Sequence, residues 1–321
     1  MESSQRMIET NGIKMRITEQ GKGPLIIMCH GFPELGYSWR HQLPALAEAG
    51  YQAVAPDQRG YGKTDCPEAI EVYNILQLVG DMVGLVQALG EEKAVIVGHD
   101  WGAPVAFNCA LLRPDIFHSL ILLSVPFSPR SWGGIRPTEM MKKMAGDLNF
   151  YILYFQEPGM VERELEADVR KTMIKALYSL SGDPPPDKRW NFMFDKGQRF
   201  IDSVHMPDTL PNWLTEEDVD VFTEAFQRSG FRGGVNWYRN IDRNWELTSF
   251  LSGARIHQPS LFIAGELDGV IVMSRGAFDN LEKNMPNLKQ KILIPGAGHW
   301  IQQERPREVN KRLIEFLKSV L

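Results

Sequence analysis

The residue types best suited to chemistry lie in the segment Gly98-His99-Asp100-Trp101-Gly102, which follows a short apolar run and precedes a helical pattern. A strand, a tight turn with small flanking residues and a helix together form the setting of a nucleophile elbow. The central residue here is Asp100, where serine or cysteine is more usual. An aspartate that only caps the following helix would give the same pattern, so the motif alone leaves both roles open.

Two later residues complete a set of nucleophile, acid and histidine in the chain order typical of this setting. Asp268 and His299 each follow a short apolar run that predicts a strand. Open α/β sheets place their sites just beyond the carboxyl ends of strands, which is where both residues are expected. Among the seven histidines, His299 alone follows both Asp100 and Asp268 and comes directly after a strand.

Two other places in the sequence are candidates for the acid. Glu266 lies two residues before Asp268 in the same predicted loop. Folds of this kind also keep an acid after the strand expected at 120–123, but Ser124 and Val125 stand there and cannot serve as one. Asp268 is therefore the favoured acid.

A carboxylate nucleophile indicates a substrate with an electrophilic saturated carbon. A serine that attacked such a carbon would be left as an ether, whereas Asp100 would form an ester. Water activated by a histidine–aspartate pair can hydrolyse that ester and free the enzyme. The two obvious leaving groups are a halide and the strained oxygen of an epoxide.

These residues have to be positioned by a sheet. Apolar runs alternate with helical patterns in both outer parts of the chain, which predicts a mostly parallel sheet with helices on both faces. Strands are expected at 25–29, 52–55, 94–97, 120–124, 259–264 and 290–294, and helices at 43–49, 75–89, up to 112 and from 306 to 321. No strand-like run occurs from residue 128 to about residue 247, which predicts an inserted helical cap. The expected division is a core of 1–127, a cap of 128–247 and a second core part of 248–321.

Composition limits the function classes. The net charge is −5 and 43% of the 321 residues are hydrophobic, which is ordinary for a globular protein and argues against a nucleic-acid partner. Three widely spaced cysteines predict neither disulfides nor a zinc site. No apolar stretch is long enough for a membrane span, and no signal peptide is recognisable, so a cytoplasmic protein is expected. No cofactor or metal motif is present.

Several motifs together resemble the soluble epoxide hydrolases of the α/β-hydrolase superfamily. The resemblance covers essentially the whole chain. The chain is similar to the single-module bacterial or plant form, which has no N-terminal phosphatase-like domain. The segments that carry it are His30–Glu34, Asp57–Gly62, Gly98–Gly102, Gly298–Trp300, Asn149–Gly159 and Phe231–Asn240.

The resemblance implies a role for each motif residue. Asp100 would be the nucleophile, His299 the base and Asp268 the acid that orients it. The backbone N–H groups of Phe32 and Trp101 would form the oxyanion hole.

The resemblance also implies two cap tyrosines that hold the epoxide oxygen, and these fall on Tyr151 and Tyr238. Tyr154, three residues after the first, is its main alternative. The expected substrate is a small apolar epoxide, and the expected assembly is a monomer or a homodimer. The residues expected to line the substrate pocket are Pro33, Trp101, Tyr154 and Trp300.

Two other functions stay open at this point. A haloalkane or haloacid dehalogenase would use the same aspartate at the elbow, but the paired cap tyrosines favour the epoxide. A binding protein on a hydrolase fold that has lost catalysis is the second, and the intact set of Asp100, Asp268 and His299 argues against it.

Overall fold

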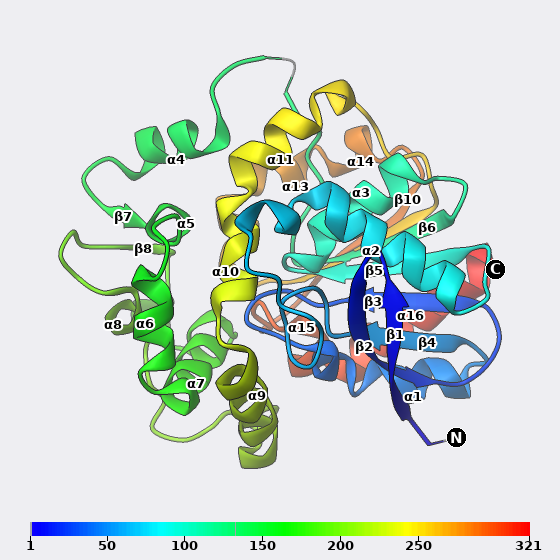
Figure 1. The fold of residues 1–321 in the computed structure, drawn as a ribbon, viewed down its shortest axis with the longest axis horizontal. Coiled ribbons are helices and arrows are strands. Elements are labelled where there is room, and N and C mark those ends of the chain that lie inside the picture. Colours follow the sequence, from blue (N-terminus) through cyan, green and yellow to red (C-terminus); the bar gives the residue numbers. More distant parts are fainter. Residues whose placement is uncertain (1, 132) are drawn as a thin grey trace.

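The computed structural model describes residues 2–131 and 133–321, which build an eight-stranded sheet covered by helices, with a mainly helical segment beside it (Figure 1). The strand order is β1-β2-β4-β3-β5-β6-β9-β10, and only the β1–β2 and β2–β4 pairs are antiparallel. The predicted α/β class with a mostly parallel sheet is confirmed. The strands are β1 (Ser4–Thr10), β2 (Ile13–Gln20), β3 (Leu25–Cys29), β4 (Gln52–Pro56), β5 (Ala94–His99), β6 (Phe117–Leu123), β9 (Ser260–Gly265) and β10 (Leu288–Ile294).

The central strands are buried on both faces, because successive side chains point to opposite sides. In β3, Ile26 and Met28 pack into the core beneath α1 and α16. Ile27 and Cys29 pack on the other side, beneath α2 and α3. This double burial explains why the central strands appear in the sequence as continuous apolar runs. The four helices are α1 (Gln42–Glu48), α2 (Ile75–Ala88), α3 (Gly102–Leu112) and α16 (Pro306–Val320).

The hairpin of β1 and β2 was not expected from the sequence. Only Ile8 and Thr10 of β1 are buried, so the strand lacks the apolar run that marks the others. The signal that was present is the turn: Asn11 and Gly12 have φ values of 44° and 75°. An Asn-Gly pair in this conformation is the strongest short-range indication of a two-residue hairpin.

The chain between β6 and β9 forms the group of green to yellow helices to the left and centre of Figure 1. Its strands β7 and β8 pair over two residues each, a ladder that the sequence did not suggest. The 3-10 turns Pro186–Lys188 and Ser249–Leu251 lie in this part of the chain, and Gly36–Trp39 and Ile70–Tyr73 lie before it. The elements are α4 (Pro137–Ala145), β7 (Asn149–Phe150), α5 (Tyr151–Tyr154), α6 (Met160–Glu166), α7 (Val169–Leu180), β8 (Met193–Phe194), α8 (Phe200–Ser203), α9 (Glu216–Ser229), α10 (Arg232–Arg239) and α11 (Ile241–Leu247).

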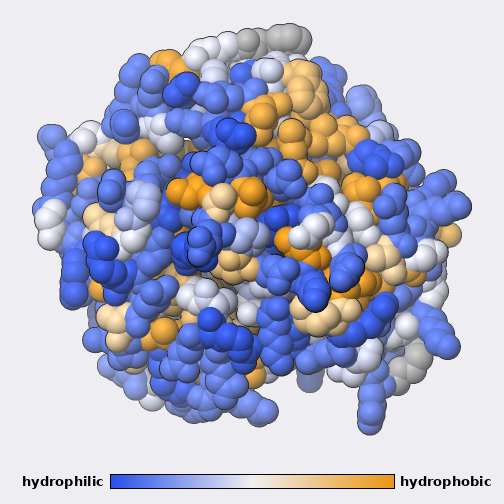
Figure 2. All heavy atoms as spheres, in the orientation of Figure 1, coloured by the Kyte–Doolittle hydropathy of each residue, from blue (hydrophilic) through white to orange (hydrophobic). Residues whose placement is uncertain are grey.

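The remaining short helices follow β9 and β10: α12 (Gly269–Met273), α13 (Arg275–Asp279), α14 (Leu281–Asn284) and α15 (Ile301–Glu304). The face seen in Figure 2 is mostly hydrophilic, with apolar residues gathered mainly towards its upper right. Within residues 2–131 and 133–321, no helix is long and apolar enough to cross a membrane.

One buried ion pair fixes the turn that follows β4. Arg59 Nη2 lies 2.5 Å from Asp81 Oδ1, and the two side chains are 4% and 0% exposed. The carbonyl oxygen of Arg59 in turn accepts a hydrogen bond from Trp237 Nε1 at 3.1 Å. The pair therefore supports both the core turn and the contact of α10 with it, which gives Arg59 a structural role.

Removing one charge from this pair should destabilise the fold strongly. Asp81→Asn leaves the Arg59 guanidinium buried without a counter-charge, which should lower the free energy of unfolding by about 3–5 kcal/mol. Urea denaturation followed by circular dichroism measures the change. The matched control is Asp115→Asn, because Asp115 pairs with Arg113 at the surface. Equal shifts of the two denaturation midpoints would contradict the structural role.

Candidate active site

The tight turn after β5 presents Asp100 between the sheet and α3. Asp100 has a φ of 49°, a left-handed conformation that is uncommon for a residue with a side chain. The neighbouring glycines are required by close approach. A β-carbon on Gly98 would lie 2.1 Å from the Gly102 carbonyl oxygen, and one on Gly102 would lie 2.1 Å from the Cys29 carbonyl oxygen. The sequence motif is therefore a real elbow that holds its central carboxylate above the sheet.

The two oxygens of the Asp100 carboxylate lie in different surroundings. Oδ1 accepts a hydrogen bond from the backbone N–H of Phe32 at 2.8 Å. Oδ2 lies 3.4 Å from His299 Nε2. Gly31 makes this approach possible, since a β-carbon there would come within 2.3 Å of the Asp100 side chain. One oxygen is thus held by an amide, while the other faces the imidazole of His299.

His299 and Asp268 meet behind Asp100, on the loops after β10 and β9. His299 Nδ1 lies 3.2 Å and 3.3 Å from the two carboxylate oxygens of Asp268, and both side chains are buried. Burial alone would lower the pKa of His299, but the Asp268 and Asp100 carboxylates raise it well above its usual value. Glu266, the alternative acid, is exposed to solvent.

Ser124 joins this group, although the sequence suggested no role for it. Its Oγ donates a hydrogen bond to Asp268 Oδ2 and lies 2.7 Å from His299 Nδ1. The residue follows β6, which lies between β5 and β9 in the sheet. That position was the available signal, since the carboxyl ends of adjacent parallel strands meet at one edge.

A second unexpected feature is a buried pair of Glu34 and His99. His99 Nδ1 lies 2.6 Å from Glu34 Oε2, and His99 Nε2 lies 2.7 Å from the His299 carbonyl oxygen. Burial would raise the pKa of the Glu34 carboxyl, but His99 beside it lowers that pKa to about 2. Glu34 also accepts from the Gly31 N–H at 3.0 Å. The pair therefore connects the loop of Phe32, the elbow and the loop of His299.

Two tyrosines from the mainly helical segment between β6 and β9 border the space in front of Asp100. Tyr151 begins α5 and Tyr238 lies on α10, with ring centroids 5.8 Å apart. Burial, with the negative charge of Asp100 as a further cause, raises the pKa of both phenols. Both are therefore protonated at neutral pH and are able to donate hydrogen bonds into the cavity.

The cavity between these groups is narrow and mostly apolar. Its free volume is about 40 Å³, and its polar lining consists of Asp100, His299, Tyr151, Tyr238 and Thr172. The apolar lining residues are Phe32, Pro33, Phe155, Leu165, Ala176, Leu180, Trp190, Phe192, Phe200, Phe231 and Val270.

Of the four residues predicted to line the pocket, Pro33 lies at this cavity. The Trp101 ring packs against Tyr238 at 5.1 Å between centroids and borders a neighbouring hollow of about 310 Å³. Tyr154 faces a different hollow and donates to Glu164, which leaves Tyr151 at the site. Trp300 is fully buried, and its Nε1 donates to the Leu177 carbonyl at 2.7 Å. Neither residue lies at this cavity: Tyr154 lies at another hollow, and Trp300 lies in the protein interior.

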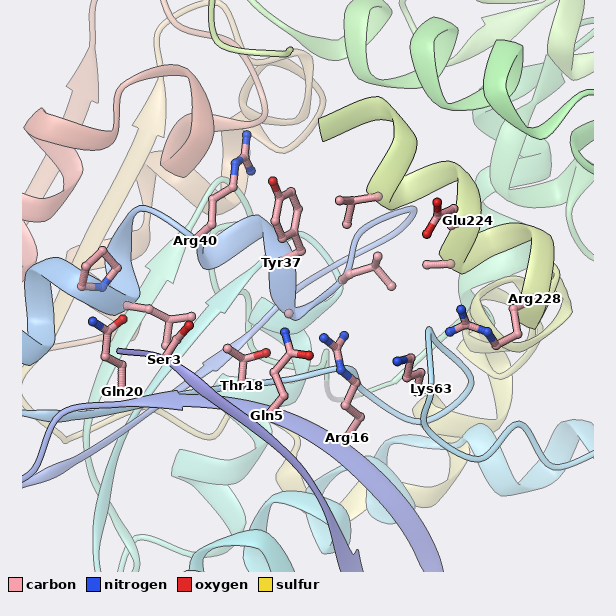
Figure 3. Close-up of a pocket in the computed structure, with 16 residues that line it drawn as sticks. Ser3, Gln5, Arg16, Thr18, Gln20, Tyr37, Arg40, Lys63, Glu224 and Arg228 are labelled. Atoms are coloured by element: carbon pink, nitrogen blue, oxygen red, sulfur yellow. The ribbon is translucent and has the colours of Figure 1, made fainter. Parts of the chain in front are cut away.

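A much larger hollow lies away from this chemistry. The groove in Figure 3 has a volume of about 560 Å³ and runs between β1, β2 and α9. Arg16, Lys63 and Arg228 point into it, and the predicted catalytic residues lie elsewhere. The chemistry of the lining, not the size of the hollow, identifies the candidate site. Among the residues that the structure describes, no group of three or more His, Cys, Asp or Glu side chains is arranged to hold a metal ion.

Comparisons with known proteins find similar sequences and structures. A family model described as the alpha/beta hydrolase fold matches residues 24–306. The chain is 47% identical over 321 residues to epoxide hydrolase A of Mycobacterium tuberculosis, which covers 99% of this chain and 98% of that protein. The crystal structure of epoxide hydrolase A from Mycobacterium thermoresistibile has 48% identity and a TM-score of 0.94, covering 100% and 99% of the two chains. An epoxide hydrolase structure from an endophytic Streptomyces has 46% identity and a TM-score of 0.95, covering 98% and 95%.

The effect of the Asp100 charge on the pKa of His299 should be measurable. Asp100→Asn keeps the size of the side chain but removes one of the negative charges that stabilise the imidazolium, so the pKa of His299 should fall by about 1–3 pH units. Histidine-ring NMR during a pH titration measures it. Glu266→Gln, which removes an exposed carboxylate from the loop of Asp268, is the control. An unchanged pKa in the Asp100 variant would show that the two groups do not interact.

Proposed function

The chain belongs to the epoxide hydrolases of the α/β-hydrolase fold, and on this premise we propose that it adds water to an epoxide through a covalent ester on Asp100. The observation that carries the proposal is that the Asp100 carboxylate is held by a backbone amide on one side and faces two tyrosines across a cavity. Its Oδ1 is held by the Phe32 amide at 2.8 Å, while Tyr151 and Tyr238 border the cavity in front of it. A nucleophile and two proton donors therefore face one space.

In the first step Asp100 Oδ2 attacks a ring carbon, and the carbon–oxygen bond of the epoxide breaks. The ring oxygen leaves as an alkoxide, a strong base that has to be protonated as it forms. Tyr151 and Tyr238 donate hydrogen bonds to it, and one of them delivers the proton. A departing halide would need no proton, so paired phenols favour an epoxide over a haloalkane.

In the second step water attacks the carbonyl carbon of the ester while His299 takes its proton. Forming the ester removes the negative charge 3.4 Å from His299 Nε2, so the pKa of His299 falls and more of the imidazole is in the neutral form that can accept a proton from water. The tetrahedral oxyanion rests on the amides of Phe32 and Trp101. His299 then returns its proton to the leaving alcohol, which completes the vicinal diol. The other proton of the attacking water passes from the Asp100 carboxyl to the tyrosine phenolate left by the first step, which restores the ionised Asp100 and the neutral phenol.

We extend the proposal to the setting of the enzyme. The aromatic lining supports an apolar epoxide as the substrate, because the cavity has no charged side chain besides the proposed catalytic groups among the described lining residues. Residues 128–247 act as the cap that supplies the tyrosines, and 1–127 with 248–321 act as the core. Free Cys29, Cys66 and Cys109 suit a reducing cytoplasm, and the enzyme acts as a monomer or homodimer.

The covalent step is tested by one turnover in heavy-oxygen water with excess enzyme and styrene oxide. The label should enter the Asp100 carboxylate and not the diol, because water attacks the ester carbonyl. Mass spectrometry of the peptide that contains Asp100 and of the diol measures both. A parallel assay with 1-chlorobutane should release no chloride. A diol labelled in the first turnover would overturn the ester, and chloride release would favour a dehalogenase.

The tyrosines can be tested by removing one phenol at a time. Losing a positioned proton donor costs about 10²–10⁴-fold, although the second phenol compensates in part. Tyr151→Phe and Tyr238→Phe should therefore each slow ester formation, and the double variant should nearly abolish it, as measured by stopped-flow single turnovers. Tyr154→Phe, the matched variant, should form the ester at the parent rate. A double variant that still forms the ester on Asp100 at the parent rate would show that both tyrosines serve only in packing.

A further inference from the structure

We propose that Ser124 is a positioning residue of the hydrolytic step, which carries the hydrogen-bonded connection between His299 and Asp268. This inference rests on the proposed function, in which His299 activates water. It gives a role to a residue that is no acid, nucleophile or oxyanion donor in that mechanism.

The distances place the hydroxyl of Ser124 between the base and its acid. Oγ lies 2.7 Å from His299 Nδ1, whereas the nearer oxygen of Asp268 lies 3.2 Å from the same nitrogen. The hydroxyl has one proton and two lone pairs. It donates that proton to Asp268 Oδ2 and is left to accept from the Nδ1–H of His299. The shorter contact of His299 Nδ1 is therefore the one with Ser124, whose hydroxyl connects the imidazole to the carboxylate.

The backbone holds this hydroxyl in place at some conformational cost. Ser124 is fully buried and has a φ of 71°, in the left-handed region that favours glycine. Its N–H donates to the Ile263 carbonyl of β9 at 2.9 Å, which fixes the residue between β6 and the strand that leads to Asp268. Because glycine would meet the backbone requirement with less strain, the position has a use for the serine side chain.

The remaining contacts of Asp268 show why a relay is useful. Asp268 Oδ1 accepts from the Val270 N–H at 2.9 Å, so this oxygen is committed to the start of α12. The other oxygen receives the Ser124 proton. The ionisable groups that face His299 are Asp268, Asp100 and the ring of His99, whose centroid is 4.8 Å away. With Asp100 neutral as an ester, the Ser124–Asp268 pair is the main remaining support of the imidazolium.

Two substitutions separate the hydroxyl from the backbone. Ser124→Ala and Ser124→Gly both delete Oγ, but alanine keeps the strain at φ 71° and glycine relieves it. Ester formation should be unaffected, since it does not need the base. Ester hydrolysis should slow by about 10- to 100-fold in both variants, as expected for a lost hydrogen bond to a charged group.

The pH profile gives a readout that packing alone would not change. Hydrolysis requires neutral His299, so its rate rises with pH through the pKa of that residue. Deleting Oγ weakens support of the imidazolium, and the rise should move to lower pH in both variants. Rapid quench followed by intact-mass spectrometry of the styrene oxide ester measures each step across pH.

Three reference proteins make the outcome decisive. His299→Gln should accumulate the ester, and Ser119→Ala, a buried serine on β6 that lies beside His118, should behave as the parent. No ester in the parent or in His299→Gln would overturn the proposed function itself. A parent that forms the ester, beside Ser124 variants with parent hydrolysis rates and pH profiles, would overturn only the role of Ser124. Slow hydrolysis in Ser124→Ala but not in Ser124→Gly would overturn it too, since strain would then be the cause.

Discussion

The buried pair of Glu34 and His99 is the interaction on which the rest of the site depends. Both ring nitrogens of His99 lie within hydrogen-bond distance of oxygen atoms, one of the Glu34 carboxylate and one of the His299 carbonyl. A buried carboxylate persists when its oxygens are hydrogen-bonded, whereas an unpartnered one would be costly. Glu34 accepts further hydrogen bonds from the Gly31 N–H and from the side chains of Gln302 and Gln303.

This pair sets the relative position of three loops that are far apart in the sequence. His99 precedes Asp100, Glu34 follows Phe32, and the carbonyl that His99 contacts belongs to His299. The distances of 2.8 Å and 3.4 Å around the Asp100 carboxylate therefore follow from contacts beneath the reacting atoms. The Asp100 carboxylate, the His299 imidazole and the Asp268 carboxylate behind it are then held together, with only Asp100 partly exposed.

The sequence predicted the parts of this arrangement that have a local signature. The central strands were predictable because burial on both faces makes them apolar throughout, and Asp100, Asp268 and His299 were identified by their positions after such strands. The β1–β2 hairpin was missed because only one side of it is buried. Ser124 and the Glu34–His99 pair were missed for another reason. Their partners lie 65 to 175 residues away in the chain, and no local pattern specifies such contacts.

The cap tyrosines show how close packing connects the two halves of the proposed chemistry. Asp100 belongs to the core, whereas Tyr238 belongs to α10, so the proton donor reaches the nucleophile only if that helix approaches the core closely. Two glycines allow this: a β-carbon on Gly233 would lie 2.2 Å from the Gly60 carbonyl oxygen, and one on Gly234 would lie 2.6 Å from the Phe32 ring. The Tyr238 ring consequently packs 5.5 Å from that of Phe32, whose amide holds Asp100. The same phenylalanine thus contacts the proposed nucleophile with its backbone and the proposed proton donor with its side chain, so that a shift of α10 would misplace the tyrosine relative to the carboxylate.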